Sequence, residues 1–445
     1  MLHAAITTNK EVVRLFGCQP VLIESSPILE FVCEEANKLV NCGIYYARQW
    51  FFKTGKYVSK FDLNYHCKTN RHFAALAAQA SQQVLGSVYE SFKSYRELLK
   101  LWKKGELEDK PKLPNYRTKG GLATVTYPKQ AIKLFDGMVR LPLGQQVKAW
   151  FGLDSFTVPM PSNLKFEDIR EVRILPRNGC FYAEFVYRLK SAKAMVDPNR
   201  VMGIDHGINN WLTCVTNVET SFIIDGRHLK SLNQWYNKEV ARLKEGQPQG
   251  FWSKRLAQLT ETRNRQMRDA INKAAKIILN HCLEHQIGRV VFGWGQGIKQ
   301  GARLGRKTQE FVQIPTARLK TRLAQLFEQY GIEFVETEEA NTSAASFLDG
   351  DSLPKFGEKP EGWKASGKRV QRGLYRTAMN WYVNADANGA ANIIRKVATT
   401  LGLDLSGVGR GTLTSPQRVF LWQLAGTREA VRLCPSDRLR QQPTA

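Results

Sequence analysis

The sequence predicts an α/β domain with a mixed sheet, joined to a helical segment and a small β module. Three strand-length apolar runs, at 201–204, 212–215 and 221–224, follow one another after Pro198. Helix, strand, helix and strand come next, and this order is typical of a mixed sheet covered by helices. With 445 residues the chain exceeds what one hydrophobic core fills, so we expect two to four domains.

The N-terminal part of the chain is expected to be helical. Ser26 and Pro27 have the residue types of a helix N-cap and first turn, and apolar positions continue at helical spacing to about residue 53. A second helix is expected over 73–104. Pro, Gly, Lys and Arg dominate residues 110–127, which predicts a basic loop at a domain boundary. The cations of this loop that we expect to bind nucleic acid are Lys112, Arg117 and Lys119.

Strands and helices then alternate to the end of the α/β domain. Short apolar runs within 127–189 predict small antiparallel strands. Beyond the three strands already named, the expected elements are helices at 229–245 and 253–286, a strand at 289–292, a helix from Pro315 to Gly331 and a strand at 332–337. The polar, Pro-containing end at 434–445 is expected to fray.

The charge of the chain indicates a polyanionic partner. Its 65 Lys and Arg outnumber 40 Asp and Glu, which gives a formal net charge of +25. Ten Trp, 14 Tyr and 22 Phe supply surfaces on which unpaired bases can stack. No apolar run is long enough to span a membrane and no signal peptide is evident, so a cytoplasmic location is expected. Eight scattered Cys without a CxxC pair favour reduced thiols.

Two aspartates stand where α/β proteins assemble sites. Asp205 directly follows the run 201–204, at the carboxyl end of an expected buried strand. Asp386 immediately precedes an expected helix. Each has an ordinary alternative, because Asp205 could be a turn residue and Asp386 a helix N-cap.

Taken together, the segments around these aspartates resemble a known family. GIDHGINN at 203–210 and NADANGAANI at 384–393 are similar to the first and third RuvC motifs of the TnpB family, the transposon-encoded, RNA-guided relatives of type V CRISPR effectors. More loosely, 79–92 and the basic loop resemble the family's helical segment and wedge, and 401–422 resembles tails of cyanobacterial members. The resemblance implies a guide RNA and target DNA as partners. It does not tell how many copies assemble on one guide.

The resemblance also implies a bilobed architecture. The expected domains are a wedge β module at 1–24 and 105–198, a helical recognition insertion at 25–104, a RuvC-like, RNase H-like nuclease domain at 199–337 and 380–400, an insertion at 338–379 and a C-terminal tail at 401–445.

In that family three carboxylates hold Mg²⁺, for which Mn²⁺ can substitute. Gly293 stands where the second motif usually has its Glu. In the RNase H-like sheet that the resemblance implies, the strand at 332–337 lies beside the strand that carries Gly293, and it leads into Glu338 and Glu339. We therefore expect Asp205, Asp386 and Glu339 to be the catalytic metal ligands, with Glu338 as second choice and Gly293 leaving room for the substitute. Alternatively, both glutamates are merely solvated.

The family's zinc element is altered as well. Members usually carry two CxxC pairs here, whereas 342–380 contain no Cys, so no zinc is predicted. Several cations remain in the segment, and we expect them to grip a phosphate backbone unless they form only a solvated surface. They are Lys364, Lys368, Arg369, Arg372 and Arg376.

Three further patterns are weaker. GWKASGKR at 362–369 lacks the Ser or Thr of a phosphate-binding loop. His281 and His285 have no evident third metal ligand, so ordinary helix-surface histidines are expected. The aromatic run at 45–52 is expected to pack within the helical lobe rather than stack on bases.

The resemblance thus implies an RNA-guided DNA endonuclease with a relocated third carboxylate. The alternatives are a nuclease-inactive, RNA-guided DNA-binding protein acting as a repressor or targeting module, and a structure-specific junction nuclease. The helical insertion and the wedge disfavour the junction nuclease.

Overall fold

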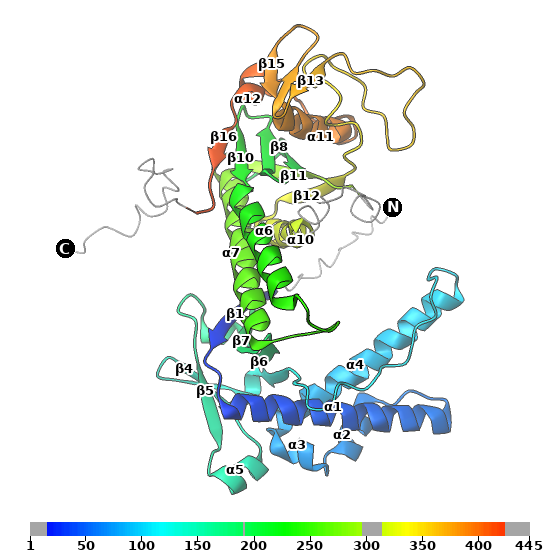
Figure 1. The fold of residues 1–445 in the computed structure, drawn as a ribbon, viewed down its shortest axis with the longest axis vertical. Coiled ribbons are helices and arrows are strands. Elements are labelled where there is room, and N and C mark those ends of the chain that lie inside the picture. The colour runs from blue at the N-terminus through cyan, green and yellow to red at the C-terminus, as the bar shows by residue number, and fades with distance from the viewer. Residues whose placement is uncertain (1–15, 190–191, 296–313, 423–445) are drawn as a thin grey trace, which may run out of the picture. The chain divides into compact units, whose positions relative to one another are not determined.

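The computed structural model describes residues 16–189, 192–295 and 314–422 (Figure 1). The chain divides into two units, one of Met1–Lys190 with Trp252–Glu261 and the other of Ser191–Phe251 with Thr262–Ala445. The fraying expected at 434–445 and the first 15 residues of the expected wedge lie outside the described residues.

The first unit begins with the predicted helix. Ser26 is the N-cap of α1 (Pro27–Thr54). The expected second helix is interrupted, because Leu76 leaves the helical conformation and forms an isolated β-bridge with Leu143. The remaining helices are α2 (Lys60–Cys67), which the sequence analysis missed, α3 (Arg71–Ala75), α4 (Ala78–Lys103) and α5 (Gln145–Phe151).

Two antiparallel sheets complete this unit, as the short apolar runs predicted. One has the order β1-β7-β6-β2 and the other β3-β4-β5. Their strands are β1 (Phe16–Ile23), β2 (Val125–Pro128), β3 (Lys133–Phe135), β4 (Met138–Pro142), β5 (Ser155–Pro159), β6 (Ile169–Arg177) and β7 (Cys180–Arg188).

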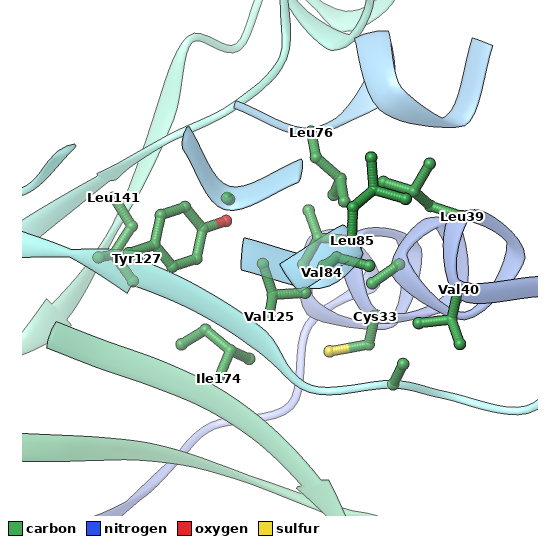
Figure 2. Packing of buried hydrophobic residues seen from close by; sticks show 14 of the residues in the cluster. Cys33, Leu39, Val40, Leu76, Val84, Leu85, Val125, Tyr127, Leu141 and Ile174 are labelled. Carbon is green, nitrogen blue, oxygen red and sulfur yellow. The ribbon is translucent and has the colours of Figure 1, made fainter. Parts of the chain in front are cut away.

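Helices and sheets of this unit share one core. Tyr127 and Ile174 from the first sheet lie near Val84 of α4 and Cys33 of α1, with Leu141 of the second sheet beside Tyr127 (Figure 2). These side chains are buried, and their removal from water stabilises the unit.

The second unit is built on a six-stranded mixed sheet of order β12-β11-β8-β9-β10-β16. Residues 332–337 and 289–292, predicted as neighbouring strands, pair in parallel as β12 and β11. The sixth strand, from the C-terminal segment, was not predicted. The strands are β8 (Asp197–His206), β9 (Asn210–Thr216), β10 (Ser221–Asp225), β11 (Ile287–Gly293), β12 (Glu333–Thr337) and β16 (Gln417–Val419).

Helices cover both faces of this sheet. Alternate strand residues such as Ile204 and Phe292 join a core with α6 (Arg227–Lys244), α7 (Lys254–Glu284) and α10 (Thr316–Tyr330). On the other face, Val201 and Val291 pack against α11 (Ala385–Leu401). The alternation follows from the two-residue period of a strand.

Between β12 and α11 the insertion forms a three-stranded sheet of β13 (Lys368–Gln371), β14 (Leu374–Arg376) and β15 (Tyr382–Asn384). A short helix, α12 (Arg410–Thr414), precedes β16. Within the described residues, no helix is both long and apolar enough to cross a membrane.

Candidate nuclease site

Asp205 lies inside the central strand β8, where it pairs with Thr213 of β9. The alternative that Asp205 is a turn residue is therefore wrong. Neighbouring strands flank β8 on both sides, so the side chain stands in the middle of the sheet near its carboxyl end. That position is where open α/β sheets place functional groups.

Asp386 lies in the first turn of α11, and the N-cap of that helix is Asn384. The Asn384 side chain accepts hydrogen bonds from the backbone N–H groups of Asp386 and Ala387, both at 3.0 Å. The alternative that Asp386 caps the helix is wrong, because Asn384 has that role. The Asp386 carboxylate is thus available for other partners.

Two donors hold the Asp386 carboxylate in place. Asn210 Nδ2 donates to Oδ2 at 2.6 Å, and Arg369 Nη2 donates to Oδ1 at 3.2 Å. Asn210 begins β9 and Arg369 lies on β13, so the sheet and the insertion converge on one side chain. Sequence reasoning did not select Asn210 or Asn384, although both stand within the quoted motifs and Asn is a preferred N-cap residue.

Two glycines let α11 approach β8. A Cβ at Gly203 would lie 2.4 Å from the backbone oxygen of Ala390, and a Cβ at Gly389 would lie 2.9 Å from Asp205 Oδ2. A side chain at Gly203 would collide with the backbone of α11, whereas one at Gly389 would displace the Asp205 carboxylate. The glycines therefore bring the Asp386 helix onto the strand of Asp205.

Glu339 follows β12 and interacts electrostatically with Asp205. Burial, reinforced by the negative charges of Asp386 and Glu339, raises the pKa of Asp205 well above its usual value. Burial also raises the pKa of Glu339, whose Oε2 lies 3.7 Å from His206 Nε2. A buried carboxylate beside two others creates a site of negative potential that attracts a cation.

The three carboxylates line one pocket of about 1340 Å³. Carboxylate oxygens are the hard donors that Mg²⁺ prefers. The donor chemistry therefore fits Mg²⁺. Among the residues described by the structure, however, no three His, Cys, Asp or Glu side chains already form a metal-binding group.

Gly293 does not leave free space for a substitute carboxylate, contrary to our expectation. A Cβ at this position would lie 2.5 Å from Ile393 Cδ1 and 3.1 Å from Cγ1. Ile393 of α11 is fully buried and occupies the space beside the glycine. Glu339 instead follows the end of β12, which is separated from the strand of Asp205 by β11.

Glu338 also lines the pocket, but both of its carboxylate oxygens have partners. Oε1 pairs with the ammonium of Lys396 on α11, and Oε2 accepts a hydrogen bond from the backbone N–H of Phe356 at 3.0 Å. Glu338 is therefore engaged by other groups of the protein, whereas the carboxyl group of Glu339 is mostly buried and lines the same pocket.

The expected basic residues of the insertion surround its small sheet. Lys364, Lys368 and Arg372 are exposed, Arg376 is half-buried, and Arg369 pairs with Asp386. The loop cations Lys112, Arg117 and Lys119 are exposed on the first unit.

The structure shows the surroundings of the two helix histidines and of the aromatic run. His281 Nε2 is hydrogen-bonded with Thr220 Oγ1 at 2.9 Å, and its ring lies 4.3 Å from that of His285. The pKa of His281 is lowered to about 4, mainly by burial, so this histidine is not the ordinary surface residue that we expected. In the aromatic run, Tyr46 and Trp50 pack against the core as expected, whereas Tyr45 and Phe52 are exposed.

Comparison with known proteins found a family that matches part of the chain and solved structures that resemble most of it. Residues 184–295 match the OrfB_IS605 family, described as probable transposases. A search of curated proteins found no match. Among solved structures, a Cas12f1–sgRNA–target DNA complex is 16% identical, with 82% of each chain covered and a TM-score of 0.53. The mini-RNA-guided endonuclease CRISPR-Cas_phi3 is 10% identical, with coverage of 88% of this chain and 94% of that one and a TM-score of 0.46.

The likeness to the Cas12f1 structure confirms the predicted fold class, an α/β RuvC-like domain accompanied by helical and β modules. The family match covers the segment that contains Asp205. Residues 184–295 thus match a family of probable transposases, and the chain shares the fold of the Cas12f1 structure.

Proposed function

We propose that the protein is an RNA-guided DNA endonuclease whose nuclease site comprises Asp205, Asp386 and Glu339. The observation that carries the proposal is that these carboxylates line one pocket and that Asp205 senses the charge of the other two. A buried carboxylate whose pKa is raised by burial and by neighbouring negative charges, as that of Asp205 is, is typical of functional sites.

Mg²⁺ bound at this site would activate a water molecule and stabilise the leaving oxygen of the cleaved phosphodiester. Asp205, Asp386 and Glu339 would hold it. Asn210 keeps the Asp386 carboxylate oriented toward the pocket through its hydrogen bond to Oδ2. Arg369 supplies a positive charge beside Asp386, where a phosphate oxygen of the substrate would be attracted.

Guide RNA and target DNA are the proposed partners. The net charge of +25 supports binding to polyanions, and the similar Cas12f1 structure is described as a complex with sgRNA and target DNA. Under this proposal the guide pairs with the target strand and supplies the sequence specificity. The wedge, helical recognition, nuclease and insertion roles expected for the domains belong to the same proposal.

A second candidate is the same guided binder without nuclease activity. Two observations favour it: Ile393 fills the space beside Gly293, and Arg369 already neutralises part of the charge on Asp386. A guanidinium paired with a ligand carboxylate competes with a metal ion for that carboxylate.

The two functions separate in one assay. Guide-dependent DNA cleavage is measured in Mg²⁺ and in Mn²⁺ for the wild type and for Asp205→Ala, Asp386→Ala, Glu339→Ala and Glu338→Ala, with guide and target binding checked for each. Ligands of shared metals act as a unit, so each of the first three changes should abolish cleavage, at a cost of several kcal/mol in the barrier. DNA cleavage by Glu338→Ala should depend on Mg²⁺ or Mn²⁺ in the same way as cleavage by the wild type.

Two results would decide against the proposed site. If the wild type binds a matched target but never cuts it, the protein is a guided binder. If cleavage survives in Glu339→Ala, the third ligand lies elsewhere.

A further inference from the structure

A loop of the insertion extends to the pocket of the three carboxylates. Lys355, Phe356, Gly357 and Lys359 line this pocket together with Asp205. The Phe356 side chain is 87% exposed, so it contributes little to the core of the insertion. A single exposed aromatic residue is ordinary by itself, but this one lines the pocket of the three carboxylates, where nucleic acid would bind under the proposed function.

The loop is fixed on both sides of the phenylalanine. Asn341 Nδ2 donates to the backbone oxygen of Pro354 at 3.0 Å, and the backbone N–H of Phe356 donates to Glu338 Oε2 at 3.0 Å. The turn continues through a hydrogen bond from the Glu358 N–H to the Lys355 oxygen. These contacts fix the backbone of the loop that carries Phe356.

Glu338 is itself fixed by the helix of the nuclease site. Its Oε1 pairs with Lys396, whose side chain is only 6% exposed and lies on α11, the helix that carries Asp386. A charged hydrogen bond to a mostly buried ammonium is stronger than one made in water. The position of Phe356 is thereby tied, through Glu338, to the same helix as a proposed metal ligand.

We propose that Phe356 is a stacking platform for an unpaired base of the strand in the pocket, and that Glu338 and Lys396 are positioning residues that set the platform beside the carboxylates. An aromatic ring can stack on the face of any base, whereas a duplex keeps those faces inside its own stack. Lys355 and Lys359 flank the ring and supply positive charge for the adjoining phosphates. The inference rests on the proposed nuclease function and adds a determinant of single-strand preference.

The first experiment measures binding without cleavage. The full-length protein, with whatever RNA it carries, is titrated with a short single strand that contains the fluorescent base 2-aminopurine and with the matching duplex, in Ca²⁺ instead of Mg²⁺. Stacking quenches this base. Phe356→Ala should weaken single-strand binding by about 5- to 100-fold and reduce the quenching. Phe356→Trp should preserve both, and Phe356→Leu, which is apolar but has no aromatic face, should not.

Salt dependence and a control separate stacking from other effects. Phe356→Ala should leave the slope of log affinity against log salt unchanged, whereas Lys359→Gln should reduce it by about 0.7. Phe420→Ala, which removes another exposed phenylalanine of the same unit outside the pocket, should change nothing. Wild-type affinity and quenching in Phe356→Ala, or equal binding by Phe356→Leu and the wild type, would overturn the platform.

Positioning by Glu338 is tested by a double-mutant cycle. Glu338→Ala should weaken single-strand binding in the wild-type background and have no further effect when Phe356 is already alanine. Additive effects would refute the positioning role. If the wild type never cuts DNA but these binding results hold, the nuclease proposal fails and the platform stands. If the wild type cuts DNA but Phe356→Ala binds normally, the nuclease proposal stands and the platform fails.

Discussion

At the scale of single residues, three glycines determine the packing around the site, each next to a different neighbour. Gly203 and Gly389 admit α11 to the strand of Asp205, whereas the space beside Gly293 is filled by Ile393. The first two positions assemble the site from segments distant in sequence. At the third position the family that the chain resembles usually has a glutamate, and here Ile393 keeps the interior packed beside the glycine.

Gly293→Ala should destabilise the protein by about 1–3 kcal/mol, because the new methyl group would overlap Ile393 Cδ1. Ile393→Val removes that carbon and alone should cost about 0.5–1.5 kcal/mol. The double variant should be destabilised clearly less than the sum, since valine makes room for the alanine. Urea unfolding of the four proteins measures the coupling. Strict additivity would mean that the two side chains do not share this space.

Asp205 should make stability depend on pH in a defined direction. Its pKa is raised in the folded state, so the folded protein holds this proton more tightly than the unfolded chain does. The stabilisation is present below the unfolded pKa of about 3.9 and disappears as the pH rises through the raised value. Asp205→Asn should therefore gain stability relative to the wild type as the pH increases, in the absence of divalent metal. A stability difference that stays constant over that range would contradict the shift.

At the scale of elements, hydrogen bonds organise the insertion without Cys. The Arg395 guanidinium of α11 donates to the backbone oxygens of Ser346, Phe347 and Asp351. The neighbouring Asn388 and Asn392 both donate to the oxygen of Ala345 at 2.8 Å. One helix thus holds the loop whose backbone polar groups would otherwise be unpaired.

Arg395→Met should loosen the insertion, because each buried carbonyl left unpaired costs about 1–3 kcal/mol. Hydrogen exchange of residues 344–352 should accelerate, and Arg395→Lys should rescue only part of the effect, since an ammonium cannot reproduce the geometry of the guanidinium. Arg372→Met, a change at an exposed arginine of the insertion, is the control. A zinc chelator should have no effect on this exchange, whereas stoichiometric zinc in the purified protein would contradict the predicted zinc-free insertion.

At the scale of the whole molecule, the charge predicts how the protein handles nucleic acid. With +25 net charges, the purified protein should carry RNA and should need it for specific DNA binding. Affinity should fall steeply with salt. Replacing Arg369, Arg372 and Arg376 together by glutamine should reduce the salt slope by about 0.7–0.9 for each phosphate that the variant no longer neutralises. Sequence-specific DNA binding that survives RNase treatment would exclude a guided mechanism.

The sequence by itself determined the fold class, the main strands of the six-stranded sheet and the two aspartates. Apolar periodicity is local, so it located the strands that became β8, β9, β10, β11 and β12, and short motifs marked Asp205 and Asp386. It also predicted that β12 lies beside β11. It missed α2, the interruption before α4 and the sixth strand β16, because an eight-residue helix, a two-residue break and a three-residue strand leave little periodic signal.

Only the tertiary structure decided which side chains meet. Asn210 and Arg369 reach Asp386 from different sheets, Ile393 fills the space beside Gly293, and Glu338 is engaged by Lys396 and the Phe356 backbone. Each contact joins residues far apart in the chain, and close packing between α11, the sheet and the insertion determines them. Residue types and spacing could mark the candidate carboxylates. That Glu338 and Glu339 have different surroundings became clear only from the folded arrangement of the sheet, α11 and the insertion.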